Sequence, residues 1–183
     1  MRTPLSPRTT TAALAFLLSL SLTCIAREPV KLAPGDTTPQ SLGTTVEGDE
    51  IDAGKYAGRV LVVTFWASWC GPCKKELPML ESIQRAAKES VKVVAVNIED
   101  REQFRKVAKA LSTLTLQITH DYRKKSSDAY GVRGIPHLVL IGRDGKVINV
   151  HRGYSEESID SIIEEINGAL AVPAPAKVVA RLE

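Results

Sequence analysis

The sequence contains few cysteines and few aromatic residues, and neither sign of charge is in large excess. Three cysteines in 183 residues are too few for a small fold held together by disulfides. Aromatic residues make up only 5% of the chain, but 44% of it is hydrophobic, which is enough for one globular domain with a core. Without residues 1–26 the chain carries 22 basic and 21 acidic residues, so its charge gives no indication of nucleic-acid binding.

The first 26 residues have the pattern of a secretory signal peptide. Arg2 and Arg8 form a basic start, and the following 18 residues, up to Ala26, are free of charge. Cleavage is expected after Ala26. Two alternatives remain open, since 18 uncharged residues are long enough for an N-terminal membrane anchor and Cys24 can be the lipidated cysteine of a bacterial lipoprotein. Each of the three places the folded part outside the cytoplasm, and the bacterial periplasm is the expected compartment.

Residues 27–45 and 171–183 are expected to flank the folded domain. The first segment holds three prolines and predicts a linker or extended lead-in, and the second predicts a flexible tail. In the domain between them, residues 46–170, short apolar runs predict strands, and apolar residues spaced three or four apart predict helices. The expected strands are 60–66, 91–97, 115–119, 137–141 and 147–151. The expected helices are 71–88, 102–111 and a last helix capped by Ser155 that runs to Leu170, and residues 122–131 are expected to form a short helix or an irregular turn.

This order of elements predicts an α/β fold. Strands that alternate with helices form a mixed sheet with helices on both faces. The segment Arg143-Asp-Gly-Lys146 is a strong turn signal, so the domain is expected to end in a β-hairpin followed by a helix.

The segment Trp69-Cys70-Gly71-Pro72-Cys73 follows a predicted strand and opens a predicted helix. Two cysteines three residues apart on the first helical turn lie side by side and can form a disulfide. The free N–H groups and the positive dipole end of the helix stabilise a thiolate there. We therefore expect Cys70 to be the exposed nucleophile and Cys73, one turn further in, to be the more buried resolving cysteine.

Two other interpretations of the cysteine pair are weaker. A structural zinc site needs four ligands, and the remaining candidates, His120, His137 and His151, lack ligand spacing. A purely structural disulfide closing so short a loop restricts the unfolded chain very little. Neither a metal nor an organic cofactor is expected.

Residues 65–74, Phe-Trp-Ala-Ser-Trp-Cys-Gly-Pro-Cys-Lys, resemble the active-site segment of thioredoxins. Gly134-Ile135-Pro136 resembles the loop whose proline is cis in thioredoxin-like folds and faces the dithiol. Four features are similar to the TlpA/ResA-like branch of extracytoplasmic thiol-disulfide oxidoreductases: the leader, an inserted helix and strand at about 100–119, the hairpin at 142–146, and Cys73-Lys-Lys-Glu76. The resemblance covers about residues 34–170.

The resemblance implies a protein thiol-disulfide oxidoreductase with a thioredoxin-like fold. It places Trp69, Gly71 and Pro72 on the partner-binding surface, and it implies that backbone groups near Ile135 and Pro136 pair with an extended substrate. The implied partners are proteins with disulfides or thiols and a membrane thiol-transfer protein that donates electrons. Cytochrome c maturation is one role of the branch.

Two residues depart from the thioredoxin pattern. Thr64 stands where cytoplasmic thioredoxins carry a buried aspartate, and we expect it simply to pack within its strand. Glu76, three residues after Cys73, is then the candidate acid/base, because a partly buried glutamate has a raised pKa; the alternative is a solvated glutamate paired with a lysine. His137 stands where a threonine is common, and it is expected either at the rim of the site or in contact with the substrate.

Gly-Pro between the cysteines favours a reducing potential, by analogy with thioredoxin. One rival hypothesis is a disulfide oxidant or isomerase that uses the same chemistry. A second is a copper chaperone that binds the metal through Cys70, Cys73 and a histidine, although the copper-delivering relatives use a wider cysteine spacing. A third is a binding domain that kept the fold without catalysis.

Overall fold

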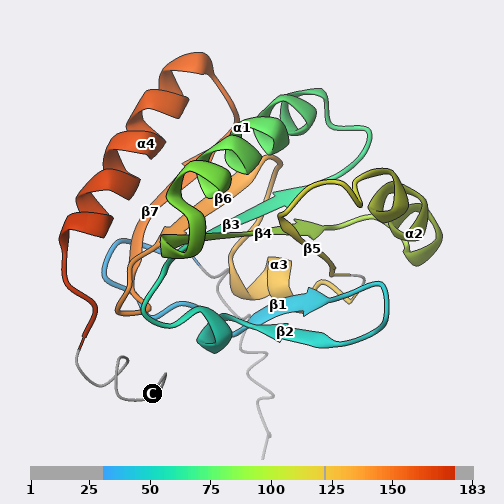
Figure 1. Ribbon diagram of the computed structural model, residues 1–183. Helices are drawn as coiled ribbons and strands as arrows, with labels where there is room; N and C mark the ends of the chain where they lie inside the picture. The colour runs from blue at the N-terminus through green and yellow to red at the C-terminus, as the bar shows by residue number, and fades with distance from the viewer. Residues whose placement is uncertain (1–30, 122, 176–183) are drawn as a thin grey trace, which may run out of the picture.

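A seven-stranded mixed sheet forms the centre of the molecule, in the order β2-β1-β5-β4-β3-β6-β7 (Figure 1). The computed structural model describes residues 31–121 and 123–175. The expected signal peptide or anchor, Cys24 and the end of the expected tail lie outside these residues.

The strands of the sheet centre follow the predicted pattern. β3, β4 and β6 have the predicted bounds: they are Val60–Trp66, Val91–Asn97 and His137–Ile141. β4 runs parallel to β3, and β6 runs antiparallel to it. All residues of β3 and β6 are buried, which explains why continuous apolar runs mark these strands. On the two sides, β5 (Gln117–His120) runs parallel to β4, and β7 (Val147–Arg152) completes the predicted hairpin with β6.

Helices cover both faces of the sheet, as predicted (Figure 1). α1 (Gly71–Ala87) and α4 (Glu156–Ala171) pack on one face, where Leu80 and Ile162 belong to one core cluster. The short helices α3 (Lys125–Ala129) and η1 (Ala53–Tyr56) lie on the other face, near the core side chains Tyr56 and Tyr130. The remaining helices are η2 (Lys88–Ser90), which follows α1, and α2 (Arg101–Ala110), which lies beyond the ends of β4 and β5.

The segment before the predicted domain differs from the expected linker. Within residues 27–45, β1 (Ser41–Thr44) enters the sheet between β5 and β2 (Glu50–Asp52). Leu42 is fully buried in the core. Gly43 has a φ of +84°, and a Cβ there would lie 2.7 Å from the His120 carbonyl oxygen, so glycine permits the close approach of β1 to β5. The lead-in therefore ends earlier than predicted, because part of it pairs with a distant strand.

Candidate active site

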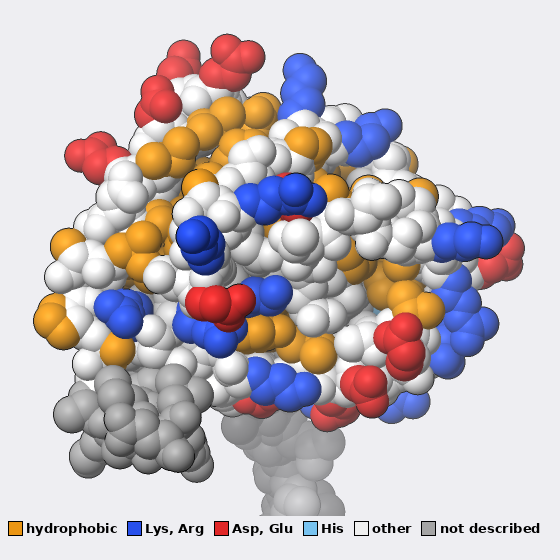
Figure 2. All heavy atoms as spheres, viewed as in Figure 1, with side chains coloured by type: hydrophobic (Ala, Val, Ile, Leu, Met, Phe, Trp, Pro, Cys, Tyr) orange, Lys and Arg blue, Asp and Glu red, His pale blue; other side chains and the backbone are white. Residues whose placement is uncertain are grey.

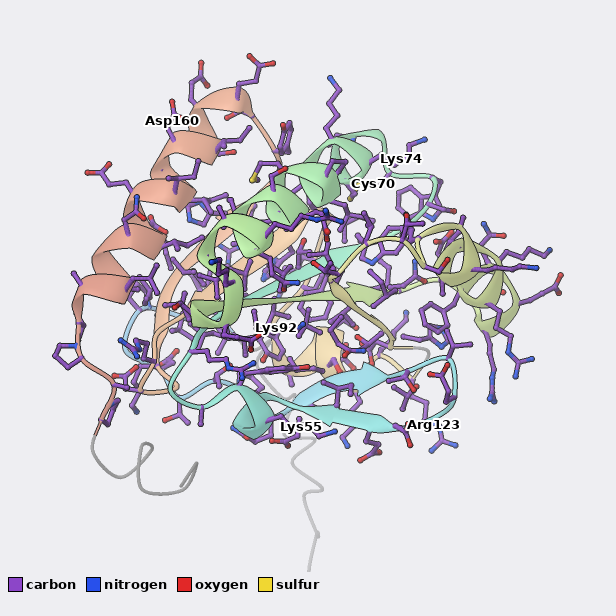
Figure 3. The ribbon with its side chains drawn as sticks, in the orientation of Figure 1. Lys55, Cys70, Lys74, Lys92, Arg123 and Asp160 are labelled. Carbon is purple, nitrogen blue, oxygen red and sulfur yellow. A yellow bond between two sulfur atoms is a disulfide. The ribbon has the colours of Figure 1, made fainter. Side chains whose placement is uncertain are left out.

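The two cysteines lie between the end of β3 and the first turn of α1. Figure 3 labels Cys70 at this point. Cys70 is the N-cap of α1, and its sulfur accepts a hydrogen bond from the Cys73 N–H at 3.2 Å. Pro72 occupies the first turn, where its missing N–H is tolerated. The two sulfurs form a disulfide, with 5.3 Å between the Cα atoms. The strand-turn-helix setting is the one predicted from the sequence.

The two cysteines differ in exposure in the expected order. Cys73 is completely buried, and Cys70 retains 5% of its surface. Cys70 is thus less exposed than predicted, because in the disulfide form its sulfur caps the helix. The neighbouring Trp69 is 69% exposed, an unusual degree for a tryptophan. Apolar surface is therefore available to a partner immediately before the more accessible sulfur.

The Ile135–Pro136 peptide bond is cis, as the resemblance implies. Pro136 directly precedes β6, whose first residue His137 pairs with Phe65 near the end of β3. Ile135 packs against the core cluster that contains both cysteines. The cis-proline loop is thus held beside the dithiol by the pairing of β3 with β6.

The rim position expected for His137 is wrong. Its side chain is 1% exposed, and its ring lies edge-on to Phe65 with 6.0 Å between the ring centroids. Side chains alternate along a strand, so Leu138 joins the cluster of the cysteines while His137 faces the opposite side of the sheet. Burial, with the charge of Arg152, lowers the pKa of His137 to about 4. Its imidazole is therefore neutral and turned away from the dithiol.

Glu76 is buried rather than solvated, so the surface ion-pair interpretation is wrong. Only 2% of the residue is exposed, and Thr64 Oγ1 donates a hydrogen bond of 2.6 Å to its Oε2. Burial raises the pKa of Glu76 from 4.5 to about 7, while the hydrogen bond from Thr64 lowers it. Thr64 was expected only to pack within β3, but its hydroxyl also holds the Glu76 carboxyl group. A carboxyl group three residues after Cys73 is able to take up or release a proton near neutral pH.

The Glu99 carboxylate holds the loop before Cys70, a role that was not predicted from the sequence. Its Oε2 accepts a hydrogen bond from Ser68 N, and its Oε1 accepts one from Ser68 Oγ, both at 2.7 Å. Asn97 Nδ2 donates to Oε2 at 2.9 Å, and Gln103 Nε2 donates to Ser68 Oγ at 3.0 Å. The signal in the sequence is that polar residues, Asn97 and Glu99, stand at and just after the end of a predicted buried strand. The parallel pairing of Trp66 with Asn97 then brings the residues after β3 and β4 to one edge of the sheet.

Glu99→Gln is expected to loosen the loop that carries Trp69 and Cys70. A glutamine carries no charge, so the hydrogen bonds that Ser68 and Asn97 make to a charged carboxylate become weaker neutral ones, at a cost of about 2 kcal/mol in unfolding free energy. The rate of disulfide exchange should fall by about 3- to 10-fold, since less precise positioning of a reacting group slows a reaction. Urea unfolding and a disulfide-reduction assay measure the two effects.

The matched control for this variant is Glu102→Gln on α2. Glu102 forms an exposed pair with Lys106, and its side chain is 80% exposed. Exposed pairs contribute little to stability, so this variant should behave as the wild type. Equal stability and equal rates for the two variants would contradict the role of Glu99.

The mixed sheet covered by helices on both faces, the cysteine pair at the start of α1 and the cis-proline loop beside it define a thiol-disulfide oxidoreductase with a thioredoxin-like fold. The Redoxin family model matches residues 33–167, and the chain belongs to that family.

Proteins similar to this chain include a thiol-disulfide oxidoreductase and a thiol:disulfide interchange protein. The chain is 31% identical over 159 residues to the thiol-disulfide oxidoreductase ResA of Geobacillus thermodenitrificans, which covers 84% of this chain and 91% of the relative. It is 28% identical over 131 residues to the thioredoxin-like protein YneN of Bacillus subtilis, covering 70% and 76%. A Chlorobium tepidum structure assigned as the thiol:disulfide interchange protein DsbE matches with a TM-score of 0.67 and 30% identity, over 76% of this chain and 99% of that one. The predicted fold class and the predicted thiol-disulfide chemistry are confirmed.

Two further observations concern only residues 31–121 and 123–175. In this part of the chain, no helix is long and apolar enough to span a lipid bilayer. The same residues include no group of three or more His, Cys, Asp or Glu side chains that is arranged to hold a metal ion.

Proposed function

We propose that this chain reduces disulfides in protein partners outside the cytoplasm. The observation that carries the proposal is the dithiol at the start of α1, with Trp69 exposed before it and the buried Glu76 behind it. The leader at residues 1–26 supports export, either as a cleaved signal peptide or as an anchor.

The proposed reaction has two exchange steps, in which electrons pass from the dithiol to the partner. The Cys70 thiolate attacks one sulfur of the partner disulfide, forms a mixed disulfide and releases the other partner sulfur as a thiolate. Cys73 then loses its proton and attacks the Cys70 sulfur, which releases the second partner thiolate and leaves the Cys70–Cys73 disulfide. The dithiol is oxidised and the partner disulfide is reduced by two electrons.

Glu76 is proposed as the acid/base of the second step. Its carboxylate would accept the proton of Cys73 as that sulfur attacks, and a pKa near neutrality suits this task. The partner would contact Trp69, Gly71 and Pro72, and its backbone would pair with groups around Ile135 and Pro136. The side chain of His137 takes no part in this contact, because it faces the other side of the sheet.

A membrane thiol-transfer protein is proposed to return the chain to its reduced form. The reductive direction needs such a donor, because each turnover leaves the Cys70–Cys73 disulfide. Cytochrome c maturation is the first cellular process to test, since the resemblance implies it as one role of the branch.

The redox potential of the Cys70–Cys73 pair tests the direction of the reaction. We expect a value near that of thioredoxin, about −270 mV, when the protein is equilibrated in thiol-disulfide buffers and read by tryptophan fluorescence. A value near that of DsbA, about −120 mV, would reject the reductase and assign the protein as an oxidant or isomerase.

A further inference from the structure

A pocket lined by cations opens at the end of β5. It has a volume of about 280 Å³, and its lining includes the basic side chains of Arg101, Arg105, Arg123 and Lys125. We call it the cationic pocket. Figure 2 shows Lys and Arg side chains gathered on this side of the molecule, over and below α2.

Aromatic side chains make one wall of the cationic pocket rigid. Phe104 of α2 is 2% exposed and stacks on the ring of His120, with 4.6 Å between the ring centroids and 8° between the planes. His120 Nε2 forms a hydrogen bond of 2.7 Å with the carbonyl oxygen of Glu99. The cations of α2 therefore project from a fixed frame rather than from a mobile loop.

Three of the four basic side chains of the cationic pocket are free of ion pairs within the described residues. Arg101, Arg105 and Lys125 form no ion pair with any residue that the structure describes, whereas Lys106 on the same helix pairs with Glu102. Two carboxylates also line the pocket. They are Asp121, which accepts hydrogen bonds from the backbone N–H groups of Ser126 and Ser127, and Glu50, the first residue of β2. The lining thus holds more basic than acidic side chains, and its net positive charge favours an anionic ligand.

The cationic pocket lies on the same edge of the sheet as the dithiol. Trp66 pairs with Asn97, and Asn97 pairs with His120, so the three residues form one row across parallel strands. Neighbouring strands are about 4.8 Å apart, which places the ends of β3 and β5 about 10 Å apart. Cys70 follows Trp66 by four residues, and Arg123 follows His120 by three, so both come shortly after the ends of these strands. Figure 3 shows Cys70 in the upper part of the view and Arg123 at the lower right.

We propose that the cationic pocket binds an acidic stretch of the protein whose disulfide reacts at Cys70. This inference rests on the proposed function, and it names the chemistry of the substrate. Arginine side chains bind carboxylates through two parallel hydrogen bonds, and cations at the rim of an interface speed the approach of an acidic partner. An extended segment covers about 3.3 Å per residue, so about four to six residues cover about 13 to 20 Å, more than the separation of about 10 Å between the ends of β3 and β5. Acidic residues at these positions from the reacting cysteine therefore reach from Cys70 to the pocket.

Three peptides with one common disulfide test the proposal. Each carries four identical residues beginning five positions from the cysteine, and these are Glu, Gln or Lys. With the wild-type protein, the Glu peptide should have the lowest KM, and its advantage over the Gln peptide should shrink as salt is added. The kcat should be the same for all three, because the dithiol itself is unchanged.

The variant Arg101→Gln with Arg105→Gln should reduce the advantage of the Glu peptide by about fivefold, as expected for two partly exposed ion pairs. The matched control is Lys106→Gln with Lys109→Gln, which removes the same charge from the same helix but does not alter the lining of the pocket. The control should retain the advantage. Equal effects in both double variants, or no advantage in the wild type, would overturn the proposal.

Binding of analogues with serine in place of the cysteines separates this proposal from the proposed function. Calorimetry should show tighter binding of the Glu analogue to the wild type, and a loss of that preference in the Arg101/Arg105 variant. If no peptide is reduced but this preference is present, the proposed reaction is wrong, and the proposal that the cationic pocket binds acidic segments is retained. If the peptides are reduced at equal KM and the analogues bind equally, the pocket proposal fails alone.

Discussion

Replacing Cys73 with serine is expected to turn the protein into a covalent trap for its partners. Cys70 can still attack a partner disulfide, but the serine hydroxyl cannot displace the partner from the mixed disulfide. One partner should therefore remain attached to each chain, and turnover should stop. Non-reducing electrophoresis followed by mass spectrometry measures the complex and identifies the attached cysteine.

Cys70→Ser is the matched control, and it should trap no partner. Cys73 is completely buried within α1 and behind Cys70, so its sulfur cannot reach a partner disulfide. Both variants lose the same disulfide, so a difference between them reports the roles of the two sulfurs. Trapping by Cys70→Ser but not by Cys73→Ser would reverse the assignment.

Glu76→Gln is expected to change how stability depends on pH. Because burial raises the pKa of Glu76 to about 7, the folded protein keeps a proton that the unfolded chain releases above about pH 4.5. The contribution of Glu76 to the free energy of unfolding is fully present below pH 4.5 and is lost as the pH rises to about 7, a change of about 3 kcal/mol. Glutamine does not titrate, so the stability of the variant relative to the wild type should increase by that amount over this range.

Urea unfolding of the oxidised proteins at a series of pH values measures this difference. Comparing the variant with the wild type cancels the contributions of all other titrating groups. A difference in unfolding free energy that does not vary between pH 4.5 and 7 would show that Glu76 titrates normally, against the burial seen in the structure.

The same variant should slow the release of the partner by about 100-fold, within the usual range for loss of a general acid or base. The rate of this step in the wild type should change with a midpoint near pH 7, and the variant should lack that midpoint. Thr64→Val separates a chemical role from a structural one, because it removes the hydrogen bond that lowers the pKa of Glu76. Its midpoint should move to higher pH, and an unmoved midpoint would remove Thr64 from the mechanism.

Much of the fold was predictable because its central strands are buried on both faces. β3, β4 and β6 are short apolar runs, and their bounds agree with the sequence prediction. β1 was missed because Ser-Leu-Gly-Thr has neither an apolar run nor an alternating pattern. Its place in the sheet depends on β5, about 75 residues further along the chain.

The parts of the site that local spacing determines were predictable. The parts that depend on the register of distant strands were less predictable. The positions of Cys70, Cys73 and Pro72 follow from one helical turn. The hydrogen bonds to Glu99 depend on how β3 pairs with β4, and the burial of Glu76 depends on Thr64 facing α1. The error for His137 came from reading its nearness to Pro136 in sequence as nearness to the dithiol in space. The alternation of side chains along β6 turns it to the other face.

The neutral, buried imidazole of His137 has a consequence for folding in acid. The unfolded chain takes up a proton at this histidine as the pH falls from about 6.5 to about 4, and the folded protein does not. The contribution of His137 to stability therefore rises with pH over much of the range in which that of Glu76 falls. The two groups lie on opposite faces of one sheet. When the protein unfolds between about pH 4.5 and 6.5, Glu76 releases a proton and His137 takes one up, so the two effects nearly cancel. Between about pH 4.5 and 6.5 these two groups together therefore change the free energy of unfolding very little, although each alone would change it steeply.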